Sequence, residues 1–244
     1  MKLYKKLAEY YDLMFSHDYM KEAKVCDKLI GKKGFLLDIG CGTGGHMMAF
    51  KKLGYEVEGL DSSKEMLRVA QKKMPGVIFH KGPMQWLNIN KEYDAITLLS
   101  RTLLFVKNLR QLRGTLKRIY YHLRPNGKLI MDLDTHEDCF DPEKNQTHYF
   151  NNQQGIEGSV TEEYDQRGDK ILWSVNLSIS ENNRIKRLID NQEFLMVNVN
   201  KLLDLMKELG FKVSVHDSRG RNTKKFAQPL ILKGVKLIKK ASQS

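Results

Sequence analysis

Short apolar runs alternate with amphipathic segments along the first 133 residues of the chain. Runs with the length and composition of buried strands occupy residues 35–39, 55–60, 77–80, 93–99 and 128–133. The segments between them carry apolar residues at helical spacing, most clearly over residues 109–123. Strands that alternate with helices in this way predict an α/β fold built on a parallel, doubly wound sheet.

The pattern changes after residue 133, where apolar and polar residues alternate with a period of two. This alternation is clearest at Ile171, Trp173, Val175, Leu177 and Ile179. Flanking strands are expected at residues 159–164 and 185–196, so an antiparallel meander interrupts the α/β pattern. Helical spacing returns after Asn198, and strands near residues 212–216 and 230–237 complete a seven-stranded sheet.

The chain therefore divides into three predicted parts. Residues 1–33 form N-terminal helices that cover the binding site. Residues 34–135 and 197–238 together form the α/β core. Residues 136–196 form an inserted β-meander that acts as a cap or substrate subdomain.

A glycine-rich turn follows the first predicted strand and leads into a helix. Gly40, Gly42 and Gly45 satisfy a dinucleotide-binding spacing, while Gly40, Gly42 and Gly44 with Asp38 satisfy a different one. A turn without side chains lets backbone amides approach a ligand closely. The carboxylate of Asp38 would repel a pyrophosphate and suits a cationic ligand instead. The alternative is a structural turn that holds no ligand.

Four stretches carry a family resemblance: residues 7–12 (LAEYYD), 38–44 (DIGCGTG), 59–63 (GLDSS) and 208–211 (ELGF). With the order of elements, they resemble the class I S-adenosylmethionine-dependent methyltransferases of the small-molecule type, such as glycine/sarcosine and amino-sugar N-methyltransferases. The resemblance covers nearly the whole chain. It implies a Rossmann-like fold with a meander after strand five, and methyl transfer to nitrogen or oxygen of a small molecule by in-line displacement.

The resemblance also implies roles for individual residues. The glycines of the turn would let the backbone pass the methionine and ribose of the cofactor, and Asp61 would accept hydrogen bonds from both ribose hydroxyls. Met84 would lie against the adenine, and Ser100 would offer its carbonyl to the methionine amino group. The full expected cofactor set is Tyr11, Asp38, Gly40, Cys41, Gly42, Gly44, Asp61, Ser62, Met66, Gly82, Met84 and Ser100.

Two of these assignments have structural alternatives. Asp61 could serve only the N-terminus of the next helix, where Ser62 and Glu65 have the spacing of a capping box. Tyr11, expected to reach across the cofactor, has a role in the core as its alternative.

The chain departs from the family pattern in two places. Residues 82–84 read Gly-Pro-Met where the family often has Gly-Asp-Met, so the acceptor for the adenine amino group is missing. Gln85 is one substitute, and recognition by backbone and shape is the other. Some amino-sugar enzymes place a histidine after the fourth strand. Here Ser100, Arg101 and Thr102 follow, which weakens the assignment to a sugar acceptor.

Catalytic residues are not conspicuous, because in-line methyl transfer depends mainly on alignment and exclusion of water. The candidates are Tyr11 and His136. An acidic loop surrounds His136 and contains Asp132, Asp134, Glu137 and Asp138. This loop would either position a cationic amine or remain a hydrated surface. Its spacing does not indicate a metal site.

Composition adds one unusual property, a formal net charge of +12. The basic residues are spread along the chain, so a solvated surface is favoured over an RNA partner. No apolar run approaches the roughly 18 residues of a membrane span. The three cysteines are far apart and typical of reduced thiols, so we expect a cytoplasmic protein without a membrane partner. Oligomeric state is left open.

Three alternative functions accompany the methyltransferase hypothesis. The first is an RNA-modifying methyltransferase that uses the basic surface. The second is a non-catalytic nucleotide-binding protein of the same fold. The third is a nicotinamide-dependent oxidoreductase that uses Gly40, Gly42 and Gly45, although the sequence offers no residues suited to hydride transfer.

Overall fold

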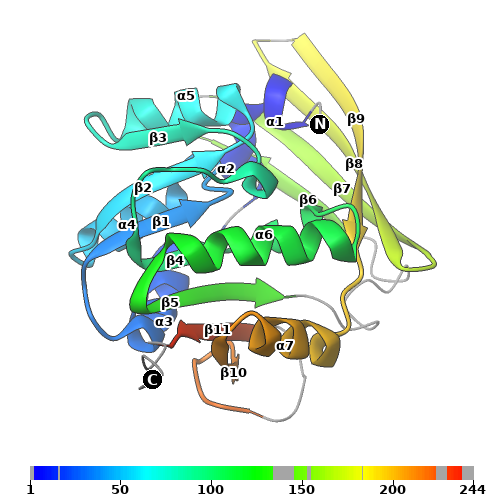
Figure 1. Cartoon of the computed structure of the whole chain (residues 1–244). Coiled ribbons are helices and arrows are strands. Elements are labelled where there is room, and N and C mark those ends of the chain that lie inside the picture. Colours follow the sequence, from blue (N-terminus) through cyan, green and yellow to red (C-terminus); the bar gives the residue numbers. More distant parts are fainter. Residues whose placement is uncertain are drawn as a thin grey trace, which may run out of the picture.

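Two β-sheets organise the chain in the computed structural model (Figure 1). The structure describes residues 3–15, 17–133, 146–152, 155–182, 184–223 and 230–237. His136 and the acidic loop from residue 134 onward lie outside the described residues. Within the described residues, no helix has the length and apolar character needed to cross a membrane.

The larger sheet has seven strands in the order β10-β11-β5-β4-β1-β2-β3. Their bounds are β1 (Phe35–Ile39), β2 (Glu56–Asp61), β3 (Ile78–Lys81), β4 (Tyr93–Leu98), β5 (Leu123–Leu133), β10 (Phe211–Asp217) and β11 (Leu230–Lys236). The first five strands pair in parallel, whereas β11 runs antiparallel to both β5 and β10. The predicted seven-stranded, doubly wound sheet is confirmed, and the carboxyl ends of β1, β2, β4 and β5 meet at one edge.

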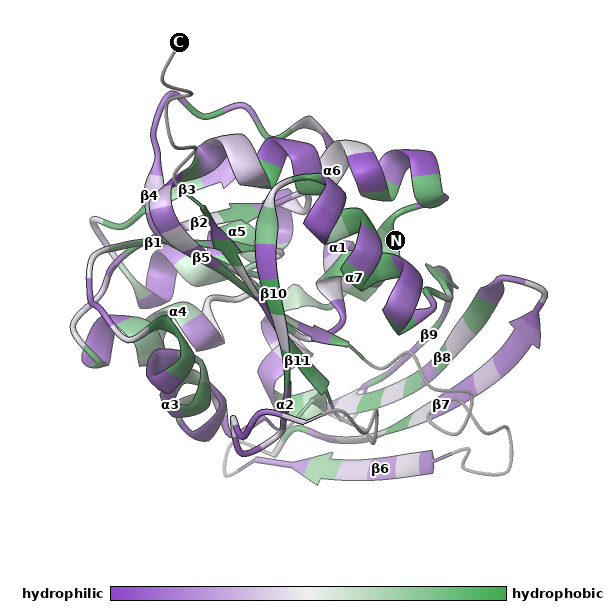
Figure 2. Cartoon of the chain, turned by 60° about the horizontal axis from the view of Figure 1, so that its bottom comes forward, coloured by the Kyte–Doolittle hydropathy of each residue, from purple (hydrophilic) through white to green (hydrophobic). Residues whose placement is uncertain are grey.

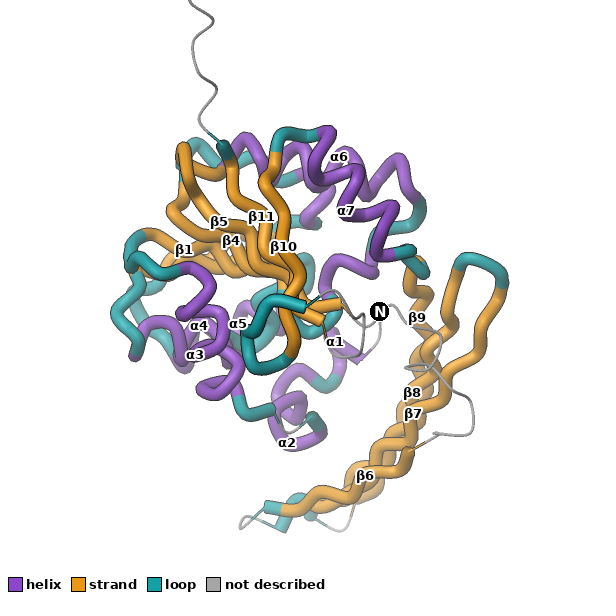
Figure 3. Tube along the Cα trace, turned by 90° about the horizontal axis from the view of Figure 1, so that it is seen from below, coloured by secondary structure: helices purple, strands orange, loops and turns teal. Residues whose placement is uncertain are grey.

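Helices cover both faces of this sheet (Figures 1 and 3). On one face lie α3 (Tyr19–Ile30), α4 (Gly45–Lys52) and α5 (Lys64–Lys73), and on the other lie α6 (Leu109–His122) and α7 (Val199–Glu208). Side-chain caps begin four of them, at Asp18, Ser63, Asn108 and Asn198. The predicted cap at Ser62 is wrong by one residue, because Ser63 has the extended backbone and accepts the Met66 amide.

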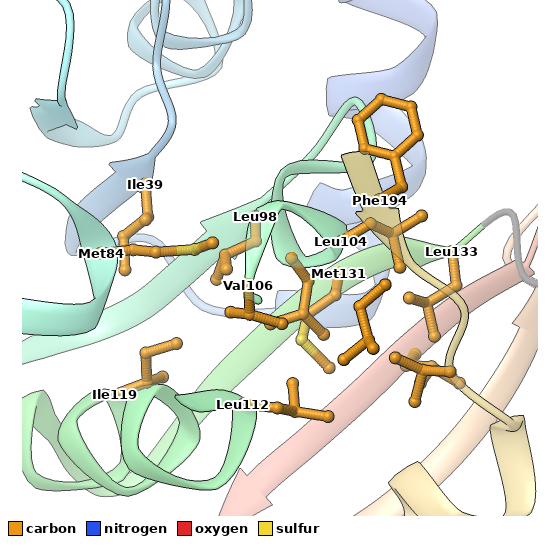
Figure 4. Packing of buried hydrophobic residues seen from close by; sticks show 14 of the residues in the cluster. Ile39, Met84, Leu98, Leu104, Val106, Leu112, Ile119, Met131, Leu133 and Phe194 are labelled. Carbon is orange, nitrogen blue, oxygen red and sulfur yellow. The ribbon is translucent and has the colours of Figure 1, made fainter. Parts of the chain in front are cut away.

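The pleat of the sheet divides the core between the two helical layers. On β5, Leu129 and Met131 face the layer of α6, while Ile130 faces the layer of α3 and α4. Figure 4 shows Leu98 and Met131 of the sheet together with Leu112 and Ile119 of α6 in this layer of the core. Hydrophobic residues are concentrated in the central strands and alternate with hydrophilic ones along the helices (Figure 2). The central strands are therefore packed on both faces by buried side chains.

The N-terminal segment forms short pieces rather than one helix: α1 (Leu3–Lys6), a 3-10 turn (Ala8–Tyr10) and α2 (Tyr11–Met14). Leu3 is buried, and its amide donates to Asp190 Oδ2 of the smaller sheet at 2.9 Å. The N-terminal segment expected to be helical therefore supplies buried side chains. Its hydrogen bond to the smaller sheet fixes part of its backbone path.

The smaller sheet is the predicted insertion, with strands β6 (Gln146–Asn151), β7 (Glu157–Arg167), β8 (Lys170–Glu181) and β9 (Arg184–Leu195). All pairings are antiparallel and follow chain order. The alternating apolar residues of β8, including Trp173 and Ile179, are buried against the core. The strand β6 was not predicted, because its residues are mostly exposed and lack apolar alternation. The sheet curves past α1 and α2 (Figure 3).

The helix α6 provides a test of how the core is packed. Leu116 is fully buried, and its neighbour Lys117 is exposed. We predict that Leu116→Ala lowers the free energy of unfolding by about 2–5 kcal/mol, since it removes apolar burial and leaves a cavity. Urea denaturation measures the loss. Lys117→Ala is the matched control and should change the free energy by less than about 0.5 kcal/mol. Equal effects of both substitutions would contradict this packing.

Candidate functional site

The glycine turn after β1 adopts a backbone that other residues tolerate poorly. Gly40, Gly42 and Gly44 have φ values of +72°, +52° and +84°. A Cβ on Gly40 would lie 2.5 Å from the Thr102 side chain. The amides of Gly40 and Cys41 both donate to Leu60 O of the adjacent strand β2, at 2.7 and 3.1 Å. The turn is therefore held tightly against the ends of β2 and the loop after β4.

Asp61 ends β2 and connects two loops at the edge of the sheet. Its Oδ2 accepts the Gly42 amide at 2.9 Å, and its Oδ1 accepts the Ser63 amide at 2.7 Å. Burial raises the pKa of Asp61, although these backbone hydrogen bonds oppose the rise. A carboxylate has several acceptor positions, so both oxygens can take further donors. Asp61 therefore both shapes the turn and faces the cavity described next.

A cavity of about 250 Å³ opens at this edge of the sheet. Its wall consists of Tyr4, Tyr11, Ile39, Gly40, Gly42, Leu60, Asp61, Ser62, Met66, Gly82, Pro83, Met84, Gln85, Ser100, Thr102 and Phe105. Nine of the twelve residues in the expected cofactor set are among them. Tyr4, Thr102 and Phe105 were not expected. Tyr4 and Phe105 form an edge-on aromatic pair with ring centroids 6.2 Å apart, a contact between segments distant in the sequence.

Three residues of the expected cofactor set, Asp38, Cys41 and Gly44, are not on the cavity wall. Asp38 is buried behind the turn, and its Oδ1 accepts the Thr97 hydroxyl at 2.6 Å. Burial raises the pKa of Asp38 to about 6. Cys41 is also buried, and its sulfur packs against Gly59 of β2, where an added Cβ would lie 2.7 Å from it. These three residues therefore lie off the surface of the first cavity.

The loop after β4 contains two consecutive residues in the left-handed region. Ser100 has φ of 55° and Arg101 has φ of 61°. Each such conformation costs roughly 1–2 kcal/mol for a residue with a side chain. The half-buried carboxylate of Asp132 accepts the Ser100 amide at 2.7 Å and the Arg101 amide at 2.9 Å, which offsets the strain. Burial raises the pKa of Asp132 to about 6.

A second cavity of about 200 Å³ adjoins the first under the smaller sheet. The two share Tyr4, Tyr11, Ser100 and Phe105 as a common wall. The far side of the second cavity is formed by Glu162, Trp173 and Phe194 of the insertion, with Phe15, His17, Glu22, Arg101, Asp132 and Leu133 completing it. The site therefore has two compartments that meet at the strained loop and the N-terminal segment.

An ion pair between α3 and α4 lies beside these compartments. His46 Nε2 is 2.6 Å from Glu22 Oε2, and His17 Nδ1 is 3.8 Å from Glu22 Oε1. Burial opposes ionisation of Glu22, but hydrogen bonds with His17 and His46 outweigh it and lower the pKa of Glu22 to about 2. Burial lowers the pKa of His46, and the Glu22 hydrogen bond reverses this, so the pKa of His46 is raised.

This pair predicts a pH dependence of stability. The Glu22 contribution is present above its ordinary pKa of 4.5 and is lost as pH falls toward about 2. The His46 contribution is present below its ordinary pKa of 6.5 and is lost as pH rises through its higher folded value. We predict that Glu22→Gln destabilises most between these two ordinary values. Urea denaturation across the pH range measures the difference from the wild type. A difference that does not vary with pH would contradict the pairing.

Comparisons with known proteins agree with this architecture. Residues 36–127 match the family model described as a methyltransferase domain. A dTDP-3-amino-3,6-dideoxy-α-D-glucopyranose N,N-dimethyltransferase of Streptomyces fradiae is 29% identical over 134 residues, which are 52% of this chain and 52% of that one. A glycine/sarcosine N-methyltransferase of Halorhodospira halochloris is 30% identical over 121 residues, 47% of this chain and 45% of its own. The chain spans about half the length of the curated relatives it matches.

A solved structure with the same fold covers nearly the whole chain. The sugar N-methyltransferase KedS8 of Streptoalloteichus superposes with a TM-score of 0.83 at 16% identity, over 94% of this chain and 92% of its own. The match over residues 36–127 shows a methyltransferase domain, and the superposition shows that the whole chain shares its fold with a sugar N-methyltransferase. Together with the sheet topology, these findings agree with the resemblance to the class I S-adenosylmethionine-dependent methyltransferases. The family resemblance of the sequence is thereby confirmed.

Proposed function

We propose that this protein binds S-adenosylmethionine in the first cavity and methylates an amine nitrogen of a small molecule in the second. The observation that carries the proposal is the junction of the two cavities at Tyr11 and Ser100. The cavities adjoin here, so a methyl donor bound in one and an acceptor bound in the other would have their reacting atoms next to each other. In-line transfer requires this arrangement. Enclosure by the insertion keeps water from the reacting atoms.

The residues of the first cavity suit each part of this cofactor. Asp61 presents a carboxylate for the two ribose hydroxyls, and the glycine turn leaves room for close backbone approach. Pro83 and Met84 offer an apolar surface for the adenine, with Gln85 beside them as a polar group. When bound, S-adenosylmethionine supplies a methyl group on a positively charged sulfur. Two carboxylates lie near the loops that would surround this charge: Asp38 is buried, and Asp132 is half-buried on the wall of the second cavity.

Support for nitrogen as the acceptor atom comes from the relatives. The relatives with specific names include three N,N-dimethyltransferases of dTDP-amino sugars, a glycine/sarcosine N-methyltransferase and a cypemycin N-terminal methyltransferase. The second cavity is smaller than the roughly 300–1,000 Å³ of sites for drug-sized ligands. Only the reacting end of a larger acceptor, or a compact acceptor as a whole, would enter it.

Asp61 provides the test of cofactor binding. We predict that Asp61→Asn weakens S-adenosylmethionine binding by about 10- to 100-fold, since hydrogen bonds to a charged group contribute about 1.5–3 kcal/mol. Isothermal titration measures the dissociation constants. Glu56→Gln changes an exposed carboxylate at the other end of β2 and should leave them unchanged. Wild-type affinity in the Asp61→Asn variant would remove Asp61 from the site.

Methyl transfer itself is tested with an acceptor of the kind the relatives use. We expect the wild-type protein to convert dTDP-3-amino-3,6-dideoxy-glucose to a methylated product when S-adenosylmethionine is added. Mass spectrometry should detect the added methyl groups together with an equal amount of S-adenosylhomocysteine. Reduced nicotinamide dinucleotide should neither bind nor react. Absence of S-adenosylmethionine binding in titration would refute the proposed function as a whole.

A further inference from the structure

The second cavity has an aromatic wall assembled from distant parts of the chain. Trp173 of β8 stacks on Phe194 of β9, with centroids 5.5 Å apart and planes at 20°. Phe105 meets Phe194 edge-on at 4.9 Å, and Phe15 lies 6.3 Å from Trp173. Together with Tyr11, these rings present π-faces and edges to the same small space. Such a wall attracts organic cations, because the faces of aromatic rings carry partial negative charge.

One carboxylate of the insertion faces this aromatic enclosure. Glu162 of β7 is 13% exposed, and its Oε1 accepts the Trp173 indole N–H at 3.0 Å and the Tyr164 hydroxyl at 3.3 Å. Its Oε2 lies 3.6 Å from His148 Nε2, which is within ion-pair distance but beyond hydrogen-bond range. The indole and the hydroxyl therefore hold the carboxylate in place, and Oε2 keeps acceptor capacity for a further donor.

The other carboxylates of the cavity already have defined tasks. Both oxygens of Asp132 accept backbone amides of the strained loop. Glu22 is bonded to His46 and lies near His17. Glu162 is thus the carboxylate whose position is set by side chains of the insertion, the part of the fold that encloses the acceptor compartment.

We propose that Glu162 binds the acceptor amine as an ammonium ion inside the aromatic enclosure and removes one of its protons. This inference rests on the proposed function. The N–H bond breaks, its proton passes to the Glu162 carboxylate, and the electron pair stays on nitrogen. That pair forms the N–CH₃ bond as the S–CH₃ bond breaks, and the sulfur retains the electrons of the broken bond. Release of the methylated ammonium product lets Glu162 return its proton to water.

The substrate class that follows is a primary or secondary amine carried on a compact group. A hydroxyl in the same place brings no charge to the carboxylate or to the rings. The singly methylated product is still a basic amine and fits the same contacts, so a second methylation is expected. The titratable and charged groups that line the cavity with Glu162, or contact it or its partners, come from several elements: Tyr11, His17, Glu22, Arg101, Asp132, His148 and Tyr164.

The test compares Glu162→Gln with Glu163→Gln, the next residue on β7, which is exposed. The probes are dTDP-3-amino-3,6-dideoxy-glucose, glycine and ethanolamine as amines, and dTDP-6-deoxy-glucose as the hydroxyl counterpart. We expect Glu162→Gln to lower kcat/KM for the best amine by about 100-fold at neutral pH, the contribution of a positioned base. Glu163→Gln should stay within about twofold. The hydroxyl compound should not react.

A pH series separates proton removal from structural support. Near pH 10 amines arrive uncharged, so the deficit of Glu162→Gln should shrink to about tenfold or less. Titration with S-adenosylmethionine should give the same dissociation constant for both variants and the wild type, since Glu162 is not on the wall of the first cavity.

The possible failures are distinguishable. Loss of cofactor binding in the wild type refutes the proposed function. Normal cofactor binding with an undiminished amine rate in Glu162→Gln overturns the role of Glu162. A deficit that is equal at every pH overturns proton removal. Wild-type protein that binds the cofactor but methylates the hydroxyl compound in preference, or no amine at all, overturns the amine assignment.

Discussion

The site depends on the hydrogen bonds that Asp132 accepts from the amides of Ser100 and Arg101. Two consecutive residues in the left-handed region would not persist in an unsupported loop. The half-buried carboxylate of Asp132, near the end of β5, supports them, and in doing so it places Ser100 on the wall of both cavities and Arg101 on that of the second. The boundary between the two cavities is therefore set by one side chain and two backbone amides.

A second carboxylate organises the other half of the site by the same principle. Asp61 connects the glycine turn to the loop before α5 through two backbone amides. Both carboxylates end parallel strands whose centres are locked in the core, so the loops inherit the rigidity of the sheet. Burial raises the pKa of each carboxyl group, because it disfavours the charged form. The hydrogen bonds from the backbone amides act in the opposite direction.

The inserted sheet has a different task from the α/β core. Its inner face brings Trp173, Phe194 and Glu162 over the second cavity, and the N-terminal segment joins it through the hydrogen bond of Leu3 to Asp190. The core forms the first cavity, which we propose for the cofactor, while the insertion contributes the far side of the second. Differences in acceptor among proteins of this class are expected to arise in such insertions, where side chains can change without disturbing the sheet.

The sequence by itself determined the alternating strands and helices, the glycine turn, Asp61 and the existence of the insertion. These features are local, since periodicity and turn chemistry act over a few residues. Tertiary structure alone decided that Asp38 is buried and bonded to Thr97, that Tyr4 and Phe105 join the cavity wall, and that Asp132 braces the loop after β4. It also decided the place of Glu162, an unremarkable acid in a polar strand. The hydrogen bonds of Asp132 and Asp38 join residues 31 to 59 positions apart, and Tyr4 and Phe105 are farther apart still. No local pattern records which distant groups the folded chain brings together.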